Sequence, residues 1–161
     1  MQKTTMRPTA IDRKMIYRRA SGNDIPLLMP LLHEFAEQVP YPRCKIDEVH
    51  MPDFWKRLID DEIGAIFMLM SDERVVGAIG GIVGPNPITG ERETVEIFWY
   101  VQPSYRGLGV YLYKLFENWA RNNGSKVLRM GFLHGVTPET IERLYDKLGL
   151  VKAETYFAKE L

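Results

Sequence analysis

The sequence predicts a mixed α/β (α+β) fold in a single domain, and three observations support this. Its 161 residues are enough to bury one hydrophobic core. Hydrophobic residues make up 45% and charged residues 26% of the chain, the balance of an ordinary globular domain. Apolar segments of strand type alternate with segments of helical period, without internal repeats or low-complexity stretches. We therefore expect a flexible N-terminal lead-in over 1–14 and one domain over 15–161.

The first third of the domain is predicted to hold one strand and two helices. The strand covers 15–19, and turn and cap residues follow it. Apolar residues then recur at helical spacing over 27–39 and indicate a helix, in which Pro30 predicts a kink or a later start. A proline-rich segment ends this helix. The second helix is expected to begin at Asp47 or Pro52.

The rest of the domain alternates strands with two further helices. A turn of Ser71 to Arg74 joins the first two strands as a hairpin, and glycine closes each helix. In chain order, we expect strands over 65–70, 75–83 and 93–101, a helix over 108–122, a strand over 127–132, a helix from Thr137 to Gly149 and a final strand over 151–161.

Charge and residue counts exclude several classes of function. Lys plus Arg and Asp plus Glu both number 21, so the balance gives no support to a nucleic-acid or membrane-surface partner. Cys44 is the only cysteine, which excludes an intrachain disulfide and a cysteine metal cluster. The three histidines share no metal-ligand spacing, so we expect no metal. The N-terminus lacks the apolar core of a signal peptide, and together these features favour a cytoplasmic location.

The most informative segment runs from Val101 to Tyr111, between a predicted strand and a predicted helix. Gly107 and Gly109 lack the Cβ that would hold a ligand away from the backbone amides. The helix that follows adds free N–H groups and the positive end of its dipole. The spacing fits neither a P-loop nor a dinucleotide-binding fingerprint. The segment thus predicts a site for some other phosphorylated cofactor.

This segment resembles motif A of the GNAT superfamily of acetyl-CoA-dependent N-acetyltransferases, whose pattern is Gln/Arg-x-x-Gly-x-Gly/Ala. Arg106 and Gly109 fill the first and fourth positions. Tyr111 stands at the sixth, where glycine or alanine is usual, and its ring would narrow the pyrophosphate site if it pointed there. The resemblance implies that the cofactor-binding residues are Val101, Arg106, Gly107, Leu108, Gly109, Val110 and Tyr111.

The predicted order of elements is also similar to the fold of this superfamily, over nearly all of the chain beyond residue 14. The resemblance implies a central mixed, mostly antiparallel sheet flanked by about four helices. It implies that two strands splay apart and that the pantetheine arm of CoA lies in the gap. The implied activity is transfer of an acetyl group from acetyl-CoA to a primary amine, by direct attack in a ternary complex, and the resemblance allows a homodimer.

Two residues are candidates for the proton transfers. The reaction needs a neutral amine and a proton for the leaving thiolate. The family often supplies the base from a glutamate on the fourth strand, where Glu96 stands here, with Glu93 as a weaker alternative. Tyr145 lies in a segment that resembles the family's last-helix signature, Leu-Tyr-x-Lys-x-Gly-Phe, whose tyrosine acts as general acid near the CoA sulfur. The alternatives are a solvated strand position for Glu96 and a core aromatic for Tyr145.

A different class of function stays open beside the enzyme. A non-catalytic acyl-CoA-binding or protein-interaction module on the same fold is the alternative, because a fold does not guarantee its usual activity. Tyr111 favours it, as does the lack of asparagine after Gly131, where relatives use one to contact the pantetheine arm. The acceptor pocket is expected to be bordered by 39–52 and 84–92, which carry no signature of a particular amine.

Overall fold

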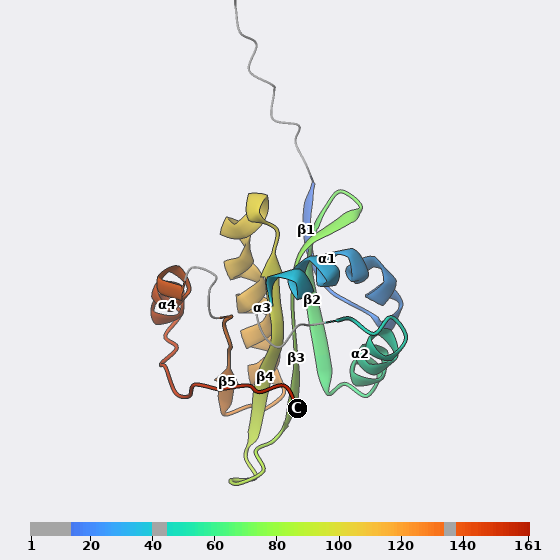
Figure 1. The fold of residues 1–161 in the computed structure, drawn as a ribbon. Coiled ribbons are helices and arrows are strands. Elements are labelled where there is room, and N and C mark those ends of the chain that lie inside the picture. Colours follow the sequence, from blue (N-terminus) through green and yellow to red (C-terminus); the bar gives the residue numbers. More distant parts are fainter. Residues whose placement is uncertain (1–13, 40–44, 134–137) are drawn as a thin grey trace, which may run out of the picture.

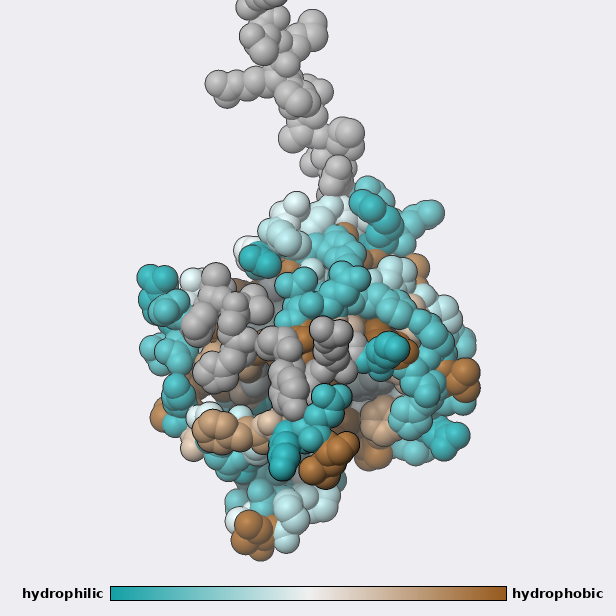
Figure 2. All heavy atoms as spheres, viewed as in Figure 1, coloured by the Kyte–Doolittle hydropathy of each residue, from teal (hydrophilic) through white to brown (hydrophobic). Residues whose placement is uncertain are grey.

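The structure, a computed structural model, describes residues 14–39, 45–133 and 138–161 (Figure 1). Most of the expected lead-in, together with Cys44 and His134, lies outside these residues. No helix in the described ranges is long and apolar enough to cross a membrane. The face shown in Figure 2 is largely hydrophilic, and its hydrophobic residues are scattered rather than gathered in one patch.

One mixed sheet forms the centre of the described part of the chain, with the strand order β1-β2-β3-β4-β5. All neighbouring strands pair antiparallel except β4 and β5, which are parallel. This confirms the mixed, mostly antiparallel sheet that the sequence predicted. The strands are β1 (Met15–Arg19), β2 (Gly64–Ser71), β3 (Arg74–Pro85), β4 (Arg92–Val101) and β5 (Val127–Arg129).

Helices cover both faces of the sheet (Figure 1). The helices α1 (Ile25–Gln38) and α2 (His50–Asp60) pack on one face, and α3 (Gly109–Asn122) packs on the other. The last helix, α4 (Pro138–Lys147), lies on the β5 side of the molecule. Short 3-10 turns, Gly22–Asp24 and Pro103–Leu108, precede α1 and α3.

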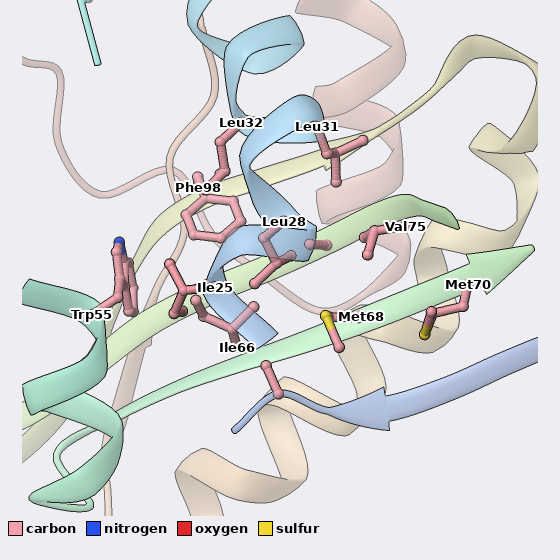
Figure 3. Close-up of a cluster of buried hydrophobic side chains, with 12 residues drawn as sticks. Ile25, Leu28, Leu31, Leu32, Trp55, Ile66, Met68, Met70, Val75 and Phe98 are labelled. Atoms are coloured by element: carbon pink, nitrogen blue, oxygen red, sulfur yellow. The ribbon is translucent and has the colours of Figure 1, made fainter. Parts of the chain in front are cut away.

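The apolar stripe of α1 explains how that helix is held. Ile25, Leu28 and Leu31 are buried completely or almost so, and they pack with Phe98 of β4 and Trp55 of α2 (Figure 3). Burial of each such aliphatic side chain contributes roughly 1.5–3 kcal/mol. The helix begins at Ile25 and runs through Pro30, which excludes the delayed start, one of the two effects expected of this proline. Its far end, beyond Leu32, reaches the side of the sheet where β4 ends.

The C-terminal expectation was also wrong. Residues 148–161 form no helix or strand, and the side chains from Val151 onward are exposed. The predicted strand over 127–132 is shorter too, because β5 pairs with β4 over only three residues. So short a ladder offers little for a further strand to pair with. The segment instead meets β5 through a side chain, since Arg129 donates to Glu154 at 3.1 Å.

Candidate active site

A β-bulge in β4 opens the sheet at one point. Gly80 pairs with Phe98 and Gly81 pairs with Glu96, so Ile97 is an extra residue with no partner on β3. A bulge bends its strand and increases the local twist. The pairing of β4 with β5 ends at Val95 and Arg129, immediately before this bulge. The two strands therefore separate beyond this point, in line with the splayed strands that the resemblance implied.

A cleft of about 460 Å³ lies beside the free part of β4. Its walls come from β4, from the segment after β5, from the end of α1, from the start of α3 and from one face of α4. Five of the candidate residues line it: Glu96, Val101, Arg106, Gly109 and Tyr145. The fold thus brings both candidate catalytic residues and part of the phosphate loop to one cleft.

The phosphate loop closes tightly against β4. The α3 helix begins at Gly109, directly after the 3-10 turn that contains Arg106, Gly107 and Leu108. A Cβ on Gly109 would lie 3.1 Å from Val101 and 3.6 Å from Trp99, whereas a Cβ on Gly107 would meet nothing within 4 Å. Glycine at 109 is thus required for close packing of α3 on β4. This packing holds the N-terminal end of α3 beside the cleft, where the Gly109 N–H donates to the carbonyl of Arg106.

The ring of Tyr111 does not line the cleft in the described structure. It is about half exposed and packs edge-on against Tyr17 of β1, with ring centroids 4.6 Å apart. The hydroxyl of Tyr17 in turn donates to the carbonyl of Leu108 at 3.1 Å. Tyr111 therefore turns towards β1 and helps to brace the loop, which removes the reason to expect that it narrows the cofactor site.

Glu96 is held at the point where the strands separate. Its Oε2 accepts a hydrogen bond of 2.9 Å from the amide of Gly131, a residue that has left the ladder with β4. Glu96 is half-buried, and desolvation by the surrounding protein raises the pKa of its carboxyl to about 7 against the opposing effect of the Gly131 N–H. At neutral pH this group both releases and takes up a proton easily.

Glu93, the weaker candidate base, has a different environment. It accepts hydrogen bonds of 3.0 Å from Asn86 and from Arg129. The Asn86 contact and then the Arg129 contact lower the pKa of Glu93, so it stays ionised. It does not line the cleft, and its role is to join the base of β4 to β5.

Tyr145 lies across the cleft on α4. Its ring stacks on Trp99 with centroids 6.3 Å apart and planes 9° from parallel. Its hydroxyl donates to the carbonyl of Gly131, whereas Glu96 accepts from the amide of the same glycine. Burial, and then the charge of Glu96, raise the pKa of Tyr145, which keeps its proton in place at neutral pH.

Gly131 and Trp99 are site residues that sequence reasoning missed or left unassigned. Gly131 acts through its backbone, which no residue pattern reveals. The indole Nε1 of Trp99 is buried without a hydrogen-bond partner in the described residues, close to where a Cβ on Gly109 would stand. Buried donors are normally paired, so an acceptor supplied by a ligand would satisfy it. Together with the positive end of the α3 dipole, this donor fits a phosphorylated or carbonyl-bearing cofactor. The described residues contain no cluster able to hold a metal ion.

Comparison with known proteins places the chain in a family. Residues 28–150 match the model of the acetyltransferase (GNAT) family, and the chain belongs to that family. No curated protein sequence matches it.

Solved structures share its fold at low sequence identity. A ribosomal-protein-alanine N-acetyltransferase from Brucella melitensis biovar Abortus 2308 is 19% identical with a TM-score of 0.67, covering 92% of this chain and 99% of that one. An aminoglycoside acetyltransferase from an uncultured soil metagenomic sample is 17% identical with a TM-score of 0.72 and the same coverage. AAC(6')-Iy, solved with a CoA-containing bisubstrate analogue, is 16% identical with a TM-score of 0.70, covering 92% and 98%.

Proposed function

We propose that this protein transfers an acetyl group from acetyl-CoA to a primary amine by direct attack in a ternary complex. The observation that carries the proposal is the placement of Glu96 and Tyr145 on the two walls of one cleft that reaches the start of α3. Membership of an acetyltransferase family and neighbours solved with CoA compounds support it. A sole cysteine fits a reducing, cytoplasmic compartment.

Acetyl-CoA supplies the activated acyl group in this proposal. The backbone of Val101 and of residues 106–111 holds its pyrophosphate, because the positive end of the α3 dipole favours an anion there. Arg106 adds a positive charge in the same wall of the cleft. The indole N–H of Trp99 offers one further donor beneath the loop.

The chemical step then needs two proton movements. The amine nitrogen forms a bond to the acetyl carbon, and the bond from that carbon to sulfur breaks. Glu96 takes the proton that the amine loses, which a carboxyl with a pKa of about 7 does readily at neutral pH. Tyr145 gives its hydroxyl proton to the leaving thiolate after turning from the Gly131 carbonyl, and is reprotonated from solvent.

The test combines a binding measurement with a product measurement. Calorimetry with acetyl-CoA is followed by a thiol-release assay over a panel of amines, with the N-acetyl product identified by mass spectrometry. We expect saturable binding and equal amounts of thiol and acetylated amine. Binding without thiol release across the whole panel would instead support the non-catalytic acyl-CoA-binding module.

Two glycine variants test the assignment of the phosphate loop. Gly109→Val is expected to weaken acetyl-CoA binding by about 10–100-fold, because the added side chain meets Val101 and Trp99. Such overpacking costs about 1–3 kcal/mol and disturbs the position of the amides at the start of α3. Gly84→Ala is the matched control, since its added methyl also meets open space and Gly84 does not line the cleft. Calorimetry measures both dissociation constants. Equal affinities for the two variants would contradict this role of the loop.

A further inference from the structure

The cleft has two halves, because the bulge at Ile97 sets which side chains face which helix. Beyond the bulge, Trp99 and Val101 pack on the α3 face, whereas Phe98 and Tyr100 pack on the α1 face. The cleft therefore crosses the free edge of β4 from one face of the sheet to the other. With the α3 half assigned to the cofactor, the α1 half is left for the acceptor amine.

The walls of the acceptor half are mainly aromatic and apolar. Phe35 and Gln38 come from α1, Tyr100 from β4, and Phe132 and Leu133 from the segment after β5. Phe35 contacts Tyr100 with ring centroids 6.2 Å apart, so these two rings form one continuous surface. Such a surface favours an apolar body and offers few partners to hydroxyl groups.

Charge in the cleft is sparse. Among the described residues that line it, Glu96 is the only carboxylate and Arg106 the only cation. A polycationic acceptor would bring several ammonium groups against these apolar walls, where unpaired charges are costly. A single amine directed at Glu96 avoids that cost.

Two additional carboxylates of α1, Glu34 and Glu37, act on Tyr100 beside the acceptor half. Glu34 accepts hydrogen bonds of 2.8 and 3.0 Å from the side-chain amide of Gln102, which is neutral. No lysine or arginine in the described ranges forms an ion pair with Glu34, although the charge of Arg106 opposes that of Glu34 at Tyr100. Burial, and then the charge of Glu34, raise the pKa of the neighbouring Tyr100. A single ammonium approaching from the α1 side is attracted by these carboxylates.

We infer that the acceptor is a primary amine on an aromatic or branched aliphatic body, such as an arylalkylamine, rather than a polycationic aminosugar. This inference rests on the proposed acetyl transfer and names its substrate class. The apolar body lies against Phe35, Tyr100 and Phe132, and the amine nitrogen points to Glu96. Some structural neighbours are aminoglycoside acetyltransferases that share the fold with this chain. The inference is that this chain differs from those neighbours in the amine that it acetylates.

The test compares amines that differ in their bodies. Thiol release is measured with 2-phenylethylamine, ethylamine and the aminosugar neamine at saturating acetyl-CoA. We expect kcat/KM for 2-phenylethylamine to exceed that for either other amine by at least about 10-fold, the effect of filling a hydrophobic pocket. A preference for neamine would overturn the inference while leaving acetyl transfer intact. If acetyl-CoA binds but none of the amines tested supports thiol release, the proposed function itself would be overturned.

Variants of α1 test whether the preference for 2-phenylethylamine comes from the aromatic surface of the cleft. Phe35→Ala is expected to lower kcat/KM for 2-phenylethylamine by about 10–100-fold and to leave that for ethylamine almost unchanged. Phe35→Leu serves if the alanine variant does not fold, because Phe35 also packs against the core. Leu27→Ala, at an exposed position of the same helix, is the matched control. An equal loss for both amines in the Phe35 variants would contradict the assignment of this surface.

Discussion

Replacement of Glu96 by glutamine is expected to lower turnover by about 10²–10⁴-fold, the usual contribution of a general base. Glutamine keeps a side-chain oxygen that accepts the Gly131 N–H, so the anchor between β4 and the segment after β5 is retained. Only the ability to take up a proton is lost. A thiol-release assay measures the loss, and unchanged binding of acetyl-CoA shows that the cleft is intact.

The pH dependence identifies the group responsible. With a pKa of about 7, Glu96 is protonated in acid and becomes a base as the pH rises. We expect kcat/KM of the natural protein to rise through about pH 7, and this limb to disappear in Glu96→Gln. The matched control is Glu93→Gln, since Glu93 lies on the same strand outside the cleft and should leave the limb in place. A limb that shifts with the pKa of the acceptor amine would belong to the amine instead.

The pH dependence of the free energy of unfolding gives an independent test of the raised pKa of Glu96. Its pKa in the folded chain, about 7, lies above the ordinary value of 4.5, so the folded state binds the proton more tightly. The contribution to stability is therefore complete below pH 4.5 and is lost as the pH rises through about 7. Thermal unfolding of the natural protein should show this loss, and the glutamine variant should lack it.

The sheet and the main helices were predictable because their signals are local. Apolar residues of α1 and α3 recur at helical spacing, and β2 and β3 read as apolar runs on either side of a turn. The segment from Val101 to Tyr111 was recognisable as a candidate phosphate loop because it resembles motif A of the family and joins a strand to the start of a helix. Local signals thus gave the fold and located one half of the cleft.

Features that depend on pairing between distant segments were not predictable. The bulge at Ile97 exists because β4 has one more residue than β3 at that point. Nothing about an isoleucine in a strand predicts a bulge. The strand expected over 151–161 did not form, because a strand also needs a partner to pair with. The direction of the Tyr111 ring, which the sequence left open, was not predictable for the same reason, since the ring packs against Tyr17, far away in the sequence.

Replacement of Tyr145 by phenylalanine is expected to lower kcat by about 10²–10⁴-fold if the hydroxyl protonates the leaving thiolate. The phenylalanine ring still stacks on Trp99, so folding and acetyl-CoA binding should change little. The variant also removes the hydrogen bond to the Gly131 carbonyl, which gives the hydroxyl a second, structural effect. The loss of proton donation and the loss of this hydrogen bond are distinguished by their effects on kcat and on KM.

Loss of proton donation lowers kcat and leaves KM for acetyl-CoA as it was, because the hydroxyl then matters only when the thiolate leaves. Loss of the Gly131 anchor loosens a wall of the cleft and raises KM. Tyr113→Phe is the matched control: it removes a hydroxyl from another ring beside Trp99, on a residue that does not line the cleft. A fall in kcat confined to Tyr145→Phe assigns the proton to Tyr145. Full turnover in that variant would make Tyr145 a packing residue, with the thiolate protonated by water.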